Sequence, residues 1–201
     1  MPRQTTDRHT ALRDRLTTLA EARIAAQGTA ALRARDLAQQ AGCAVGAIYS
    51  VFDDLGDIVL TVNARTFDRL GQALGPTDAI PATPDAARAR LVAMALAYHA
   101  FARDNRHLWR ALFNLTRPDG TRPPDWYMAH MERLFARIEA TLAPLRPDAD
   151  AMTRHLAART LFGAVHGIVQ LSLDEAGAGL PSDAVPTALD TLVRRLAGAE
   201  P

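Results

Sequence analysis

The sequence predicts an all-α protein of about nine helices, and three observations support this prediction. Apolar residues recur at helical spacing along most of the chain, no stretch alternates apolar and polar residues as a half-buried strand does, and glycine or proline separates the helical segments. The expected helices cover residues 7–27, 34–41, 45–51, 58–74, 85–103, 107–115, 123–142, 148–173 and 182–197.

Glycine and proline residues mark several of the expected helix ends. Gly28 and Gly42 follow the first two helices, where a glycine can adopt the positive φ that closes a helix. Pro123 and Pro124 precede the seventh helix, where proline is tolerated. Residues 75–84 contain three prolines and no apolar period, so we expect a linker or a surface loop there.

Composition excludes several classes of function. The 201 residues allow one or two domains, and 23 basic residues against 22 acidic ones leave a net charge of +1. All the basic residues are arginine, which excludes Schiff-base lysine chemistry and the lysine of a P-loop. Cys43 is the only cysteine, so the chain has no internal disulfide. Because no nucleophile–base pair or metal-ligand spacing is present, we expect no enzyme, no metal and no cofactor.

Neither a secretory signal nor a membrane span is expected. The first thirty residues contain five arginines without an apolar run. The longest apolar stretch, residues 156–173, is interrupted by Arg159 and His166, and a lipid-facing arginine costs about 2.5 kcal/mol or more. We therefore expect a buried helix at this position and a cytoplasmic protein.

Residues 34–51 have the pattern of a helix-turn-helix, two short helices joined by Gly42-Cys43-Ala44. Ala38 is small where the two helices must cross closely, and Gly42 suits the turn. Four apolar residues are expected to face the core: Leu37, Val45, Ile48 and Phe52. Tyr49 is then expected to point outward. A short helix of this kind fits the major groove of DNA, which is about 12 Å wide.

Residues 35–52 resemble the DNA-binding motif of the tetracycline-repressor-like (TetR/AcrR) family of transcriptional regulators. The resemblance lies in the Arg-x-Leu-Ala opening, the Ala-Gly turn and the Tyr-x-x-Phe close. Residues 98–102 and the later Phe162, His166 and Gly167 are similar to a WHG-type ligand domain, with Phe162 in place of the Trp. The resemblance implies a three-helix DNA-binding domain over residues 1–56. It implies a helical ligand-binding and dimerisation domain over residues 57–201.

The motif departs from the family pattern at four positions. Ala44 stands where a Ser or Thr usually caps the recognition helix, and Ala47, Val51 and Leu55 replace polar or basic residues. Residues 1–52 contain seven arginines and four acidic residues, but three aspartates within residues 53–57 remove that positive charge. An alternative therefore stays open, in which the chain is a ligand-binding or interaction module with weakened or lost DNA binding.

Six residues are expected to contact double-stranded DNA: Arg33, Arg35, Val45, Gly46, Tyr49 and Ser50. The resemblance implies phosphate contacts for the two arginines and for Tyr49, with an ordinary surface role as the alternative. Val45 and Gly46 would lie nearest the bases, although neither side chain can form a hydrogen bond.

The middle of the chain supplies a candidate pocket for a small, mainly apolar effector. Nine residues are expected to line it: His99, Phe101, Trp109, Phe113, Trp126, Tyr127, Met131, Phe135 and His166. The alternative is that the apolar residues only fill the core and that the histidines are satisfied within it.

The last two helices supply a candidate homodimer interface. Six residues are assigned to it: Gly163, Gly167, Ile168, Leu189, Leu192 and Leu196. The family dimerises through these helices, and packing within one subunit is the alternative. Two-fold pairing would place the recognition helices about 34 Å apart, matching a pseudo-palindromic operator. Taken together, we expect a repressor that an effector releases from its operator.

Overall fold

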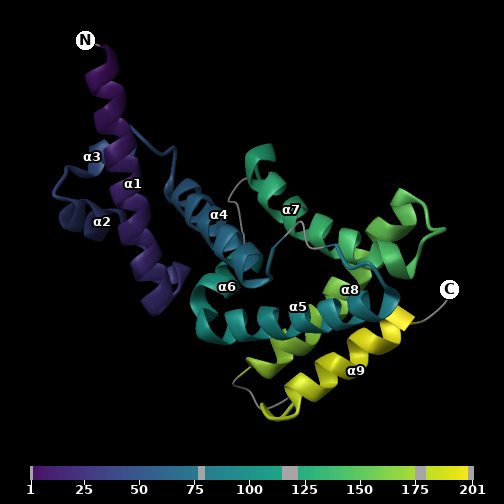
Figure 1. Ribbon diagram of the computed structural model, residues 1–201. Coiled ribbons are helices and arrows are strands. Elements are labelled where there is room, and N and C mark those ends of the chain that lie inside the picture. Colours follow the sequence, from purple (N-terminus) through teal and green to yellow (C-terminus); the bar gives the residue numbers. More distant parts are fainter. Residues whose placement is uncertain (1, 77–79, 115–121, 175–179, 199–201) are drawn as a thin grey trace. The chain divides into compact units, whose positions relative to one another are not determined.

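The computed structural model describes residues 2–76, 80–114, 122–174 and 180–198, and within these residues it contains nine α-helices and no strand (Figure 1). The predicted all-α fold of about nine helices is therefore confirmed. The helices are α1 (Pro2–Gln27), α2 (Ala34–Ala41), α3 (Val45–Ile48), α4 (Leu55–Ala73), α5 (Pro84–Asp104), α6 (Arg106–Phe113), α7 (Asp125–Leu142), α8 (Ala151–Ser172) and α9 (Val185–Gly198).

The helix ends lie close to the glycine and proline signals. Gly28 and Gly42 both have a positive φ, of 79° and 65°, directly after α1 and α2. At Gly42 the backbone N–H donates to the Gln39 carbonyl and that of Cys43 donates to Ala38, which closes the helix as a left-handed cap. Helix α7 begins directly after Pro123 and Pro124. Residues 77–79 of the predicted linker lie outside the described residues.

The chain forms two compact units. Unit 1 comprises Met1–Asp68 and Asn105–Tyr127, and unit 2 comprises Arg69–Asp104 and Met128–Pro201. The expected domain boundary after residue 56 lies inside unit 1, near the start of α4, and it stays a prediction.

Unit 1 is built around α1, which packs against α2 and α6. Leu16, Ala20 and Ile24 of α1 have no exposed surface and form the centre of one apolar core. Side chains from α2, α3, α4 and α6, and Phe52 after α3, join them: Leu37, Ala38, Ile48, Phe52, Ile58, Val62, Leu108 and Ala111. The short helices α2 and α3 are thus held by packing, since helices of eight and four residues are marginal alone.

Unit 2 is a packed group of long helices, in which α5 contacts α8 and α9 and α8 contacts α9. Buried residues recur at helical spacing along each of them, for example Val185, Leu189, Val193 and Ala197 on α9. Among the described residues, no helix is both long and apolar enough to cross a membrane.

Candidate nucleic-acid interface

The helix-turn-helix consists of α2, the turn at residues 42–44 and α3, and it has the predicted outward face. Ile48 is fully buried, while the Tyr49 side chain directly after α3 is 51% exposed. Val45 corrects the sequence prediction, because 39% of its surface is exposed although we expected it to face the core. Val51, which follows α3, is partly buried and packs against the core of unit 1.

The second helix of the motif is shorter than predicted. Helix α3 ends at Ile48, and residues 49–51 continue as tight turns in which Ser50 N–H donates to Ala47 and Val51 N–H donates to Ile48. The residue before α3, Ala44, has the extended backbone of an N-cap but provides no side-chain hydrogen bond to the helix. As Ala44 in the sequence indicated, the N-terminus of α3 therefore has no side-chain cap.

Arg13 of α1 fixes the end of the motif from the inner side. Its guanidinium lies 4.1 Å from the centre of the Phe52 ring and donates hydrogen bonds to the Val51 carbonyl and to Thr61 Oγ1 of α4. A guanidinium over an aromatic face is an attractive cation–π contact. Arg13 was not among the residues predicted from the sequence. The signal for it is an arginine in the core-facing register of an amphipathic helix.

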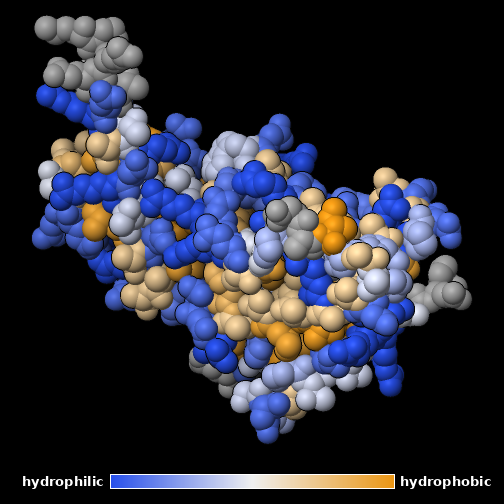
Figure 2. All heavy atoms as spheres, viewed as in Figure 1, coloured by the Kyte–Doolittle hydropathy of each residue, from blue (hydrophilic) through white to orange (hydrophobic). Residues whose placement is uncertain are grey.

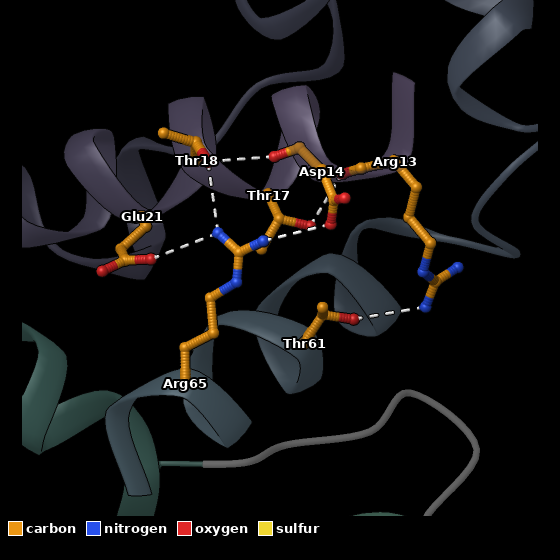
Figure 3. A network of polar contacts seen from close by, with 7 residues as sticks. All are labelled: Arg13, Asp14, Thr17, Thr18, Glu21, Thr61 and Arg65. Carbon is orange, nitrogen blue, oxygen red and sulfur yellow. Dashed lines mark hydrogen bonds and ion pairs between the residues drawn. The ribbon is translucent and has the colours of Figure 1, made fainter. Parts of the chain in front are cut away.

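A second arginine, Arg65 of α4, makes further polar contacts with side chains of α1 (Figure 3). Arg65 lies 3.2 Å from an Asp14 carboxylate oxygen and 3.7 Å from one of Glu21, and it also donates to Thr18. These charges are partly exposed, so each pair contributes at most about 1 kcal/mol. Arg13 and Arg65 together join α1 to α4, the helix that follows the motif.

The two arginines assigned to phosphate contacts are both exposed at the start of α2. The Arg33 guanidinium donates to the carbonyls of Ala30 and Leu32, which fixes its stem over the preceding turn. A guanidinium has five N–H donors, so these two bonds leave capacity for a phosphate. Arg35 is exposed on the same helix, and Ser50 is exposed but donates its hydroxyl proton to the Ala47 carbonyl at 2.7 Å.

The nine residues assigned to a ligand pocket divide between the two units. In unit 1, the rings of Trp109 and Phe113 lie 5.4 Å apart and those of Trp126 and Tyr127 6.0 Å apart. Trp109 is fully buried, whereas Trp126 is 46% exposed. The other five residues belong to unit 2: His99, Phe101, Met131, Phe135 and His166.

Unit 1 also contains a buried polar pair, formed by the predicted Tyr127 and by Asn63, which was not among the residues predicted from the sequence. Asn63 has no exposed surface and donates from Nδ2 to the Ala111 carbonyl at 2.9 Å. Its Oδ1 and the nearby hydroxyl of Tyr127 have no hydrogen-bond partner of acceptable geometry. Burial raises the pKa of Tyr127 to about 12, an effect that the Asn63 side chain partly offsets, so the phenol stays neutral at neutral pH. The signal was a polar residue on the apolar face of α4.

Unit 2 brings together an aromatic group around the half-buried His166, in which Tyr98 and Phe135 are buried. The Tyr98 hydroxyl lies 2.7 Å from His166 Nδ1, and the Phe162 ring stacks on the imidazole with centroids 5.4 Å apart. Phe135 meets Phe162 edge to face, and the Arg159 guanidinium lies over Phe135. Burial lowers the pKa of His166, which favours the neutral imidazole.

His99 lies beside a charged pair at the end of α5. Burial is the main cause that lowers the pKa of His99, and the positive charge of Arg103 lowers it further. Within the residues that the structure describes, no three His, Cys, Asp or Glu side chains are grouped so as to hold a metal ion.

The six residues assigned to a dimer interface lie on α8 and α9 of unit 2. Gly163 is exposed, and Gly167 and Ile168 are half-buried on the same helix. On α9, Leu192 and Leu196 are half-buried, but Leu189 has no exposed surface and packs inside its own unit. Leu189 is therefore a core residue of the monomer.

Comparison with known proteins places the chain among regulators. The family model described as the tetracyclin repressor-like C-terminal domain matches residues 91–196. No curated protein matches the chain.

Solved structures share the fold over nearly the whole length. A protein of unknown function from Rhodococcus sp. RHA1 is 27% identical, with a TM-score of 0.71 over 92% of this chain and 95% of its own. A TetR-family transcriptional regulator from Streptomyces coelicolor is 18% identical, with a TM-score of 0.64 over 96% of this chain and 90% of its own. One from Bordetella parapertussis 12822 is 20% identical, with a TM-score of 0.59, and the match covers 92% of this chain and 93% of that chain. The chain belongs to the tetracyclin repressor-like (TetR) family of transcriptional regulators.

Proposed function

We propose that the chain is a DNA-binding transcriptional repressor that acts as a homodimer and releases its operator when a small effector binds. The observation that supports DNA binding is the outward face of the helix-turn-helix. Tyr49 and Val45 are exposed on one side of a segment whose other side is buried, and Arg33 and Arg35 are exposed nearby on α2. In this motif, exposed residues of the second helix contact base edges, while arginines and hydroxyl groups contact DNA phosphates and so fix the position of the protein on the duplex.

Titration of labelled DNA tests this proposal. A mixture of fluorescent 30-base-pair duplexes would be titrated with the full chain at about 50 and 200 mM salt. We expect affinity to fall steeply with salt, because each phosphate contact releases counterions. Arg35→Ala is expected to weaken binding and to reduce the salt slope by about one contact per subunit, or about two per dimer. Arg195→Ala on α9, also exposed, is the matched control. Absence of any salt-dependent binding would favour the alternative, a module of this fold without DNA binding.

The proposed effector site uses the buried polar groups of unit 1. Asn63 Oδ1 and the neutral Tyr127 hydroxyl would take a hydrogen-bonding group of a mainly apolar molecule. Trp109 lies on α6, whose Ala111 carbonyl accepts from Asn63, and Trp126 precedes Tyr127 on α7. Because two tryptophans lie in this unit, intrinsic fluorescence reports binding directly. Compounds that quench it are expected to release the labelled duplex, and Tyr127→Phe is expected to weaken both effects equally. A compound that binds without changing DNA affinity would contradict effector control.

The proposed dimer interface is the exposed side of α8. Met152, Leu156 and Leu171 are 64%, 57% and 49% exposed, and Gly163 lies between them on the same side. No atom lies within 4 Å of a Cβ built on Gly163, so a larger side chain fits the monomer and would hinder only a close partner. Gly163→Glu is therefore expected to shift the mass measured by light scattering from dimer to monomer. Thr187→Glu, exposed on α9, is the control. A monomeric native chain would contradict the interface.

A further inference from the structure

The outward face of the motif contains no side chain that can form the paired hydrogen bonds by which a base is identified. We define the recognition surface as the exposed residues of the segment that begins at the N-cap of α3: Ala44, Val45, Gly46, Tyr49 and Ser50. It contains no arginine, asparagine or glutamine. Its side-chain hydrogen-bonding groups are the single hydroxyls of Tyr49 and Ser50, and Ser50 donates its proton to the Ala47 carbonyl. In the region of α1 and α2 on the face shown in Figure 2, hydrophilic residues cover much of the surface, with smaller hydrophobic areas between them.

The acidic residues after the motif do not supply the missing contacts. An Asp54 carboxylate oxygen accepts the backbone N–H of Asp57 at 2.8 Å, and one of Asp57 accepts that of Asp53 at 3.3 Å. These bonds cap the N-terminus of α4, which begins at Leu55. The glutamines of α2, Gln39 and Gln40, are exposed, but the first helix of such a motif crosses the DNA backbone instead of entering the groove.

The chemistry of base edges leaves one feature that this surface can bind selectively. Guanine is distinguished through N7 and O6 by paired donors, and adenine through N6 and N7 by an amide, and the recognition surface offers neither. Thymine also presents a C5-methyl group, which alanine and other apolar side chains contact. Val45 is 39% exposed, Ala44 presents its own methyl group, and Gly46 has open space where a Cβ would lie, so the backbone can approach closely.

We propose that this regulator selects its operator through contacts between the methyl groups of Val45 and Ala44 and the C5-methyl groups of thymine. Hydrogen bonds to base edges from the recognition surface play no part in this selection. The inference rests on the proposed DNA binding and adds the partner chemistry: half-sites with thymine under α3. Tyr49, whose hydroxyl suits a phosphate, and the α2 arginines then supply affinity without sequence preference.

Replacing thymine by deoxyuracil tests this inference, since the change removes the methyl group and keeps every hydrogen-bonding atom. Duplexes selected by the full chain from a random library would be resynthesised with uracil at single thymine positions. We expect one or two positions per half-site to lose about fourfold in affinity, the effect of one buried methyl group, and about fifteenfold when both half-sites are changed. Uracil elsewhere is expected to change affinity less than twofold.

The Val45→Ala variant tests whether the Val45 side chain contacts the C5-methyl group of thymine. Because Val45 is exposed, the variant is expected to fold as the native chain does, with an unchanged melting temperature. The loss caused by uracil is expected to fall below twofold in it, and to stay near fourfold in Ile80→Ala, which truncates an exposed apolar residue outside the motif.

Two results would overturn the inference, and they are distinguishable. Selective binding that uracil does not change, or selected half-sites that depend on guanine, would overturn it while leaving the proposed function intact. Failure of the chain to bind any duplex at low salt would overturn the proposed function and this inference with it.

Discussion

The inner and outer sides of residues 44–52 differ in how many contacts hold them in place. On the inner side, Ile48 and Phe52 are buried, and Arg13 lies over the Phe52 ring and holds the Val51 carbonyl. On the outer side, Val45 and Tyr49 are exposed, and α3 has no capping side chain. The motif keeps its shape through the inner side alone. Its outer side can therefore differ from the family pattern at Ala44 and Ala47 without loss of the fold.

Truncation on the inner side is expected to have the largest effect. Phe52→Ala removes a buried ring and the partner of the Arg13 guanidinium, and such changes cost about 3–5 kcal/mol. Val45→Ala on the outer side is expected to change the free energy of unfolding by less than about 0.5 kcal/mol. Urea unfolding followed by circular dichroism measures both. Similar losses in the two variants would show that the two sides are not distinct.

The inner side was the part of the motif that the sequence predicted well. Spacing placed Leu37, Ile48 and Phe52 in the core, and the structure confirms all three as buried. The same spacing failed at Val45, because the first residue of a four-residue helix lies at the edge of its buried face. Periodicity averages over several turns, so it cannot decide the orientation of a residue in a helix of one turn.

Loss of the Arg13 contacts is expected to have the second largest effect. Arg13→Met keeps the apolar stem but removes the cation–π contact and the hydrogen bonds to Val51 and Thr61. We expect the free energy of unfolding to fall by about 1–2 kcal/mol. Arg15→Met, an exposed arginine two residues along α1, is the control and is expected to change it by less than about 0.5 kcal/mol. Equal changes would mean that Arg13 does not fix the motif.

A new cap on the outer side is expected to stabilise the motif. Ala44 already has the extended backbone of an N-cap, with φ −71° and ψ 149°, so Ala44→Ser supplies the missing acceptor without a backbone change. The expected gain is about 0.5–1 kcal/mol in thermal or urea unfolding. Ala11→Ser, exposed in the interior of α1, is expected to lose about 0.5 kcal/mol, because serine forms helix less well than alanine. A loss at both positions would show that α3 does not need a cap.

The candidate ligand residues were less predictable than the motif. The sequence correctly indicated aromatic residues on successive helices, and Tyr127 and Trp109 are buried as a pocket or core residue would be. Helical spacing reports which face of a helix is apolar, but it does not report which neighbour that face meets. For this reason the sequence grouped Trp109 with Phe135, which the structure places in different units, and gave no weight to Asn63.

The smallest effect on the free energy of unfolding is expected at Arg65. Both Arg65 and Arg13 link α1 to later parts of unit 1, but the partners of Arg65 are charged (Figure 3). Arg65 pairs with the exposed carboxylate of Asp14 and with Glu21, whereas the partners of Arg13 are neutral. Arg65→Met is expected to cost less than about 1 kcal/mol at low salt, and the cost is expected to shrink at 1 M salt, where charges are screened beyond about 3 Å. The cost of Arg13→Met is expected to stay nearly constant over the same range. Asp14→Asn in the Arg65→Met background is expected to add nothing further, because the pair is already broken. A cost at Arg65 that is independent of salt would mean that its stem, and not its charge, joins α4 to α1.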